Sequence, residues 1–277
     1  MNLKCLRLVL IVTIITAGFA TEAQELTRIW ETDSTLMVPE SVFFDKKNKV
    51  LYVSNIDGEP WGKDGKGSIG KVGLDGKILE AEWVTGLSAP KGMGLHNNTL
   101  YVADMGELVA IDIKSGKITK RIAVDGAEGL NDVSVDKSGV VYVTDSRTKK
   151  VHRVQNGTAS LFLENLKGPN GVLVHNNSIY VLDAGGMYKV EKDKSLKMLA
   201  EGMEGGTDGV EHVKGNEFIV SCWGGVIYYV NGDGTKKLLL DSRDQKINSA
   251  DIGYDAAKRI VYVPTFFKNS VVAYQLK

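Results

Sequence analysis

One short pattern recurs six times along this chain of 277 residues. Each copy is an alternating apolar stretch, a polar turn, and then a β-branched and aromatic stretch, which is typical of two strands joined by a hairpin. The copies align on a polar or small residue near the start of each first strand. These register positions are Glu40, Lys91, Asn131, Asn170, Asp208 and Ala250.

The spacing of the copies predicts the architecture. Successive register positions lie 38 to 51 residues apart, close to the ~40–50 residues of a four-stranded propeller blade. We therefore expect an all-β fold, a six-bladed β-propeller. A strand from one terminus must complete the blade formed by the other, because an open blade edge exposes backbone donors and acceptors. Residues 26–33 and 270–277 both have strand patterns and are the candidates for this ring closure.

The first residues are expected to lie outside the propeller. A basic start precedes an apolar run from Leu8 to Ala20 and then small residues, which is the pattern of a cleaved signal peptide. The run is too short for a membrane span, and Cys5 precedes it, whereas a lipoprotein cysteine would follow it. We therefore expect a signal peptide over 1–23, one propeller domain over 24–277, and export to the periplasm or the extracellular space without a membrane anchor.

The charge balance and the cysteine content limit the classes of binding partner and the covalent cross-links that we expect. The chain has 34 basic and 34 acidic residues, which argues against nucleic acid or an anionic membrane as the main partner. Cys222 is the only cysteine after the expected cleavage site, so we expect no intrachain disulfide. A monomer that binds a small molecule is the expectation.

The register positions carry the candidate chemistry. The first strand of each propeller blade lines the central axis, so these residues are expected to face one another. They supply two carboxylates, two amide oxygens and one ammonium. Such oxygen donors suit calcium, which accepts ~6–8 oxygens in irregular geometry. We expect one divalent cation held by Glu40, Asn131, Asn170 and Asp208, with calcium favoured over magnesium. The competing interpretation is that each is an ordinary turn residue before a strand.

Four short motifs resemble those of a known family. They are Pro39-Glu40-Ser41, Leu130-Asn131-Asp132, Gly168-Pro169-Asn170-Gly171 and Asp208-Gly209. In order and spacing they are similar to motifs of the senescence marker protein (regucalcin)/gluconolactonase family. The resemblance implies a six-bladed propeller with a catalytic calcium or zinc ion. It also implies that Glu40, Asn170 and Asp208 are metal ligands, and that Asn131 binds either the metal or the substrate.

The chain also departs from that family. Sugar-lactonase members commonly carry an arginine two positions before the asparagine matched by Asn131, and this chain has Gly129 there. Paraoxonase-like members place a histidine at the sixth register position, where this chain has Ala250. The resemblance therefore does not imply that this chain is specific for gluconolactone, or that a histidine assists its mechanism.

Together these features predict a metal-dependent hydrolase of a lactone or related ester. Asp208, Asn131 and Lys91 are the candidate catalytic residues, with Asp208 or a metal-activated water handling the proton. The Lys91 ammonium has three interpretations: it binds an anionic substrate group, pairs with Glu40 or Asp208, or bends into solvent. The alternative function is a non-enzymatic propeller, similar to NHL-type or strictosidine-synthase-like repeats, that binds a small molecule, glycan or peptide.

Further residues are expected around the mouth of this site, at the rim of the same face of the propeller. The first repeat is the longest, and its extra residues fall in 56–68. We expect this insertion to fold over the mouth, with Trp61 as one wall and Trp223 opposite. Asp104 and Asp145 end the second strands of their blades, where they either support the site or cap turns.

Overall fold

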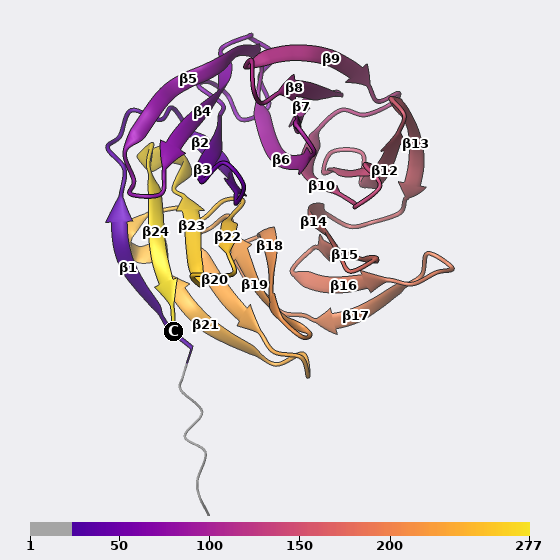
Figure 1. Ribbon diagram of the computed structural model, residues 1–277. Coiled ribbons are helices and arrows are strands. Elements are labelled where there is room, and N and C mark those ends of the chain that lie inside the picture. The colour runs from indigo at the N-terminus through magenta and orange to yellow at the C-terminus, as the bar shows by residue number, and fades with distance from the viewer. Residues whose placement is uncertain (1–23) are drawn as a thin grey trace, which may run out of the picture.

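The chain folds as a closed wheel of strands. The computed structural model describes residues 24–277, so the expected signal peptide at 1–23 lies outside the described residues. Six four-stranded antiparallel sheets stand as blades around a central axis (Figure 1). In this part of the chain the helical elements are two short 3-10 turns, η1 (Arg243–Gln245) and η2 (Phe266–Lys268). The predicted all-β, six-bladed propeller is confirmed.

Each of the first five blades is a meander of consecutive strands, counted from the axis outward. Blade one is β2 (Pro39–Asp45), β3 (Val50–Asn55), β4 (Gly67–Gly73) and β5 (Ile78–Leu87). Blade two is β6 (Pro90–His96), β7 (Thr99–Asp104), β8 (Glu107–Asp112) and β9 (Lys117–Ala123). Blade three is β10 (Leu130–Val135), β11 (Val141–Asp145), β12 (Lys150–Gln155) and β13 (Thr158–Leu163). Blade four is β14 (Pro169–His175), β15 (Ser178–Asp183), β16 (Gly186–Val190) and β17 (Leu196–Ala200). Blade five is β18 (Thr207–Lys214), β19 (Glu217–Cys222), β20 (Val226–Val230) and β21 (Lys236–Asp241).

The sixth blade closes the ring with strands from both ends of the propeller. It consists of β22 (Gly253–Asp255), β23 (Ile260–Pro264), β24 (Val271–Leu276) and, on its outer edge, β1 (Leu26–Glu31). β1 pairs with β24 antiparallel, from Leu26 opposite Leu276 to Glu31 opposite Val272. The indigo and yellow ends of the chain therefore lie side by side in Figure 1. The expected terminal-strand closure is confirmed.

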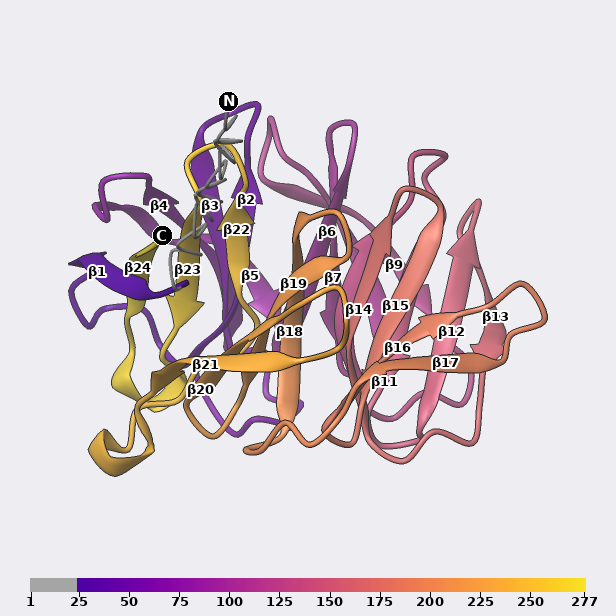
Figure 2. The same ribbon diagram turned by 90° about the horizontal axis from the view of Figure 1, so that it is seen from below.

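Apolar packing fills the spaces between blades. Each of six buried clusters draws its side chains from two neighbouring blades, so the core is a ring of six interfaces. Figure 2 shows inner strands such as β14 and β18 running along the axis while the outer strands β17 and β21 lie across it, as strand twist requires. The inner strands consequently carry their first residues to one end of the axis. No helix of the described residues is long and apolar enough to cross a membrane.

Trp30 provides a test of the closure. Its ring lies 5.8 Å from that of Tyr262 in β23, and its indole nitrogen donates to the Leu74 carbonyl at 3.0 Å. Trp30→Ala is expected to lower the free energy of unfolding by about 2–3 kcal/mol, because a half-buried aromatic is lost from a packed interface. Ile29→Ala on the exposed side of the same strand, where the side chain is 48% exposed, is expected to change it by less than about 0.5 kcal/mol. Urea unfolding measures both, and equal losses would contradict this role for Trp30.

Candidate functional site

A β-bulge at the register position aims each candidate side chain at the axis. In blades one to five the pairing between first and second strands skips the register residue, for example between Leu130 and Val133 in β10. A bulged residue is released from the ladder and its side chain is turned away from the regular alternation. The skipped residues include Glu40, Lys91, Asn131, Asn170 and Asp208, and in blades two to five the residue that follows is skipped as well.

Aspartates at the ends of second strands fix the segments that lead into these bulges. Asp104 accepts hydrogen bonds from the amides of Ser88 and Ala89, just before Lys91. Asp145 binds the amides of residues 128 and 129 before Asn131, and Asp183 binds those of residues 167 and 168 before Asn170. Asp104 and Asp145 therefore cap turns, and through those turns they position the site.

The inner strands approach one another closely. A Cβ on Gly171 would lie 2.4 Å from the Asp208 carbonyl oxygen, and one on Gly209 would lie 2.4 Å from Asp251 Oδ1. Real Cβ contacts of that length do not occur, so the position after the bulged residue must be glycine in these two blades. Glycine here lets neighbouring blades bring their polar residues toward the same point.

The five bulged residues line one pocket of about 390 Å³ at the axis. Its floor is polar and its walls are apolar. The lining residues are Glu40, Pro60, Trp61, Lys91, Asn131, Asn170, Asp208, Trp223, Phe266 and Phe267. The sixth register residue, Ala250, is fully buried beside Phe266 and supplies no polar group.

The floor holds two carboxyl groups against one ammonium. Lys91 Nζ lies 3.8 Å from Glu40 Oε1, and both side chains are buried. Burial raises the pKa of Glu40 to about 7, although Lys91 opposes the shift. Burial and then the charge of Glu40 hold the pKa of Asp208 well above its usual range. Burial lowers the pKa of Lys91 despite both carboxylates. One ammonium does not compensate the burial of two carboxylates, so burial favours the protonated forms of these carboxyl groups.

Several oxygen atoms on the floor have no hydrogen-bond donor among residues 24–277. These buried atoms are Glu40 Oε2, Asn170 Oδ1 and Asp208 Oδ1. Asn131 donates through Nδ2 to Ser146 Oγ at 3.0 Å, which leaves its Oδ1 as an available acceptor. Orphaned buried acceptors of this kind fit a hard cation such as Ca²⁺ or Mg²⁺. The described residues contain no group of three or more His, Cys, Asp or Glu side chains placed to hold a metal, so the set suits zinc poorly.

The expected insertion forms one wall of the mouth. It connects β3 to β4 and brings Pro60 and Trp61 into the pocket. Lys91 Nζ lies over the Trp61 ring at 4.3 Å, and Arg147 approaches the same ring at 5.2 Å. Lys91 is therefore buried and pairs with Glu40, which contradicts the interpretation that it bends into solvent. Binding of an anionic substrate group by Lys91 stays a prediction.

Sequence reasoning missed the opposite wall in part. Trp223 was expected there, but its partners Phe266 and Phe267 were not. They lie in η2, directly after the second strand of blade six, and their rings contact Trp223 at 5.5 and 6.2 Å. The available signal is that they follow the end of a second strand, the position at which Asp104 and Asp145 lie in their own blades.

Other nucleophiles and bases of the described chain stand elsewhere. His96, His175 and His212 lie near the far ends of their inner strands, where His175 and His212 stack with ring centroids 3.6 Å apart. Cys222 is fully buried, and burial raises the pKa of its thiol to about 12, so it is an inert core residue.

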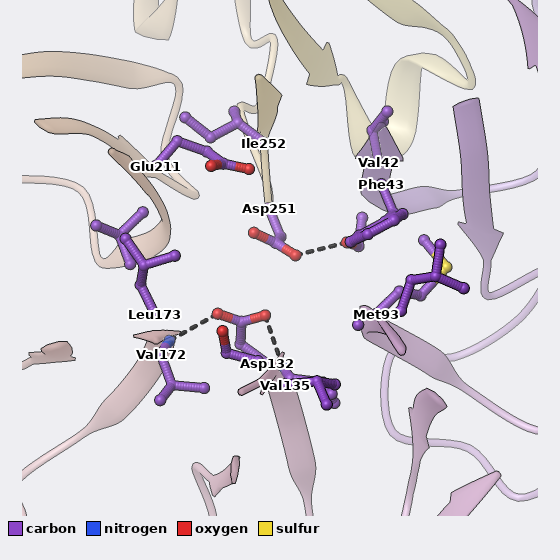
Figure 3. A pocket seen from close by; sticks show the side chains of 16 residues that line it. Val42, Phe43, Met93, Asp132, Val135, Val172, Leu173, Glu211, Asp251 and Ile252 are labelled. Atoms are coloured by element: carbon purple, nitrogen blue, oxygen red, sulfur yellow. Dashed lines mark hydrogen bonds between the residues drawn. The ribbon is translucent and has the colours of Figure 1, made fainter. Parts of the chain in front are cut away.

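A second hollow of about 230 Å³ lies along the axis and was not anticipated. Figure 3 shows the carboxyl groups of Asp132, Glu211 and Asp251 pointing into it. Asp132 accepts from the amides of Val133 and Val172 at 2.6 Å each, and Asp251 accepts from Ser41 Oγ. Burial raises the pKa of Asp132 to about 7 and that of Glu211 to about 8. Asp132 and Asp251 thus tie neighbouring inner strands together.

Comparison with known proteins shows the fold. No family model and no curated protein matches the chain. A gluconolactonase from Xanthomonas campestris superposes with a TM-score of 0.69 at 16% identity, covering 88% of each chain. A catalytically inactive histidine-to-alanine variant of virginiamycin B lyase from Staphylococcus aureus, crystallised with quinupristin, gives 0.65 at 13% identity over 92% of this chain and 100% of that one. A chain of the nidogen/laminin complex gives 0.65 at 17% identity, over 79% and 85%.

The buried charge pair can be tested by a double-mutant cycle. Lys91→Met is expected to lower the free energy of unfolding by about 3 kcal/mol in the presence of a chelator, because two buried carboxyl groups lose their counter-charge. Glu40→Gln in the same chain is expected to restore part of the loss. Urea unfolding of wild type, both single variants and the double variant measures the coupling. Strictly additive effects would show that the two groups do not interact.

The second hollow predicts a pH dependence. Because burial raises the pKa of Glu211 to about 8, the folded state keeps this proton up to about that pH, whereas the unfolded chain loses it near the ordinary pKa of 4.5. Between these values the native state binds more protons, so stability falls as pH rises. Glu211→Gln is expected to flatten the fall in unfolding free energy between pH 5 and pH 8. Parallel wild-type and variant curves would show that Glu211 titrates normally.

Proposed function

We propose that this protein is a divalent-cation-dependent hydrolase of a lactone or related ester, with calcium as the cation. The observation that carries the proposal is the set of three buried oxygen atoms that have no hydrogen-bond donor among residues 24–277, on a floor with two carboxyl groups and one ammonium. Glu40, Asn131, Asn170 and Asp208 would hold the ion. When bound, a calcium ion supplies Lewis-acid polarisation of an ester carbonyl.

The residues on the floor of the pocket supply the remaining catalytic roles. Asp208 would accept the proton of the attacking water, since its carboxyl group is on the floor and its buried Oδ1 has no hydrogen-bond donor among residues 24–277. The Lys91 ammonium balances the negative charge that develops on the reacting carbonyl oxygen. Asn131, fixed by Ser146, orients the ester. The aromatic walls exclude bulk water and thereby strengthen these interactions.

Hydrolysis fits this pocket better than elimination. The virginiamycin B lyase variant that lacks one histidine is described as catalytically inactive, and no histidine of the described residues lines the axial pocket here. The described residues that line the axial pocket therefore offer no imidazole base for an elimination. A water molecule and a carboxyl proton acceptor suffice for hydrolysis. The gluconolactonase with the same fold supports the lactone class.

Cation binding and turnover are tested on the same samples. Chelator-treated wild type is expected to gain about 2.7 kcal/mol of stability at Ca²⁺ concentrations of about 100 times the dissociation constant. Asp208→Asn and Asn170→Ala are expected to lose this gain together with hydrolysis of a lactone and aryl-ester panel. Asp193→Asn, at an exposed turn that bonds Ser195, is the matched control and is expected to keep both.

The outcomes separate the enzyme from the binding module. Stabilisation by Ca²⁺ without turnover of any ester would support a propeller that only binds a small molecule, glycan or peptide. No stabilisation by Ca²⁺, Mg²⁺ or Zn²⁺ would overturn the metal site itself. Thermal unfolding measures stabilisation by the cation, and product formation measures ester hydrolysis.

A further inference from the structure

Exposed aromatic rings surround the mouth of the axial pocket. Trp223 is 41% exposed and Phe267 is 58% exposed. Phe266 lies between them, with its ring 4.7 Å from that of Phe267 and at nearly a right angle to it. Large exposed aromatics gathered at one pocket mark a surface that receives an apolar group.

Trp61 faces this cluster across the pocket, and its position depends on Gly129. A Cβ on Gly129 would lie 2.7 Å from Arg147 Cγ and 3.0 Å from Trp61 Cζ3. No side chain can occupy position 129 while Trp61 and Arg147 keep their places. The Trp61 ring and the Arg147 side chain therefore occupy the space that a side chain at residue 129 would take.

A side groove extends the pocket over blades four and five. Its volume is about 470 Å³, and it shares Trp61, Asn131, Asn170 and Trp223 with the axial pocket. Glycine residues line much of the remainder: Gly168, Gly185, Gly205 and Gly206. The space is thus longer than a small lactone ring requires.

The walls offer few partners for hydroxyl groups. In the axial pocket the carboxyl, amide and ammonium groups all belong to the floor residues. In the groove, Ser146 Oγ donates to the Pro169 carbonyl while accepting from Asn131, and Thr207 Oγ1 accepts from the Gly185 amide, so its own O–H is the one hydroxyl donor left for a ligand among these two side chains. A polyhydroxylated lactone would leave most of its hydroxyl groups without partners against these rings, and such losses are costly.

We propose, resting on the hydrolase function above, that the substrate is a lactone or ester that carries an apolar aromatic substituent and is not a sugar lactone. Its carbonyl group lies over the oxygen-rich floor. Its ring packs between Trp61 and the wall formed by Trp223, Phe266 and Phe267. A longer substituent follows the groove over blades four and five. Phe267 is the specificity-determining residue that can be changed with least effect on the fold, because it is the most exposed of these rings.

Two matched ligand pairs test the class. Phenyl-δ-valerolactone and glucono-δ-lactone share the same lactone ring and serve as substrates in the presence of Ca²⁺. Their non-hydrolysable lactams serve as binding probes, with tryptophan fluorescence and calorimetry as readouts. The phenyl lactam is expected to bind about tenfold more tightly than the sugar lactam, from burial and stacking of one aromatic ring.

The Phe267→Ala variant tests whether the wall that contains Phe267 binds the phenyl substituent. It is expected to weaken phenyl-lactam binding about fivefold and to raise KM for the phenyl lactone by a similar factor, with kcat little changed. Leu238→Ala, at a residue 50% exposed on β21, is the matched control and is expected to change neither value. Thermal unfolding confirms that both variants are folded.

The two proposals fail separately. Tight phenyl-lactam binding that depends on Phe267, without hydrolysis of either lactone, would support the ligand class and overturn the hydrolase. Hydrolysis of glucono-δ-lactone at least as efficient as that of the phenyl lactone, with no effect of Phe267→Ala, would keep the hydrolase and overturn the substrate class. Equal binding of the two lactams would also overturn it.

Discussion

The close approach of the inner strands around the axis is the constraint on which the rest of this structure depends. Main-chain hydrogen bonds join blade six to blade one, where Asp251 donates to the Glu40 carbonyl at 2.9 Å and accepts from the Val42 amide at 3.1 Å. Glycine at positions 171 and 209 permits the same closeness between other blades. Side chains released by bulges in these strands have no route to solvent except the mouth of one pocket. Polar residues that are far apart in the sequence are thereby desolvated together.

Two sets of carboxyl groups along the axis show what this desolvation produces. Asp132 has both oxygens engaged by backbone amides, so its burial is compensated in part and it joins blades three and four. Asp208 has no hydrogen-bond donor to its Oδ1 among the described residues. The charge of Glu40 acts on Asp208, and the Lys91 ammonium opposes that effect. Two buried aspartates along the same axis therefore differ in role. Asp132 holds two blades together, whereas Asp208 keeps an oxygen atom that can still bind a ligand.

Much of this could be predicted from the sequence, and the limits have physical causes. The repeat predicted the blades, their first strands and the five polar residues that meet at the axis, because period-two alternation and register spacing are local properties. The role of Asp145 as a cap was one of two open interpretations. Glu211 and Phe267 were not found, because their placement depends on how one blade packs against the next. No pattern within a single repeat encodes that packing.

Lys91 connects the floor of the pocket to its walls. Its ammonium pairs with Glu40 on one side and lies over the Trp61 ring on the other. A ring that stabilises a cation also shields it from water, so the insertion that supplies Trp61 strengthens the charge interactions beneath it. The apolar wall and the charged floor are therefore coupled: a ligand ring that packs on Trp61 would complete the exclusion of water from Lys91 and Glu40. In this arrangement, recognition of an apolar substituent and the strength of the electrostatics at the carbonyl position arise from the same side chain.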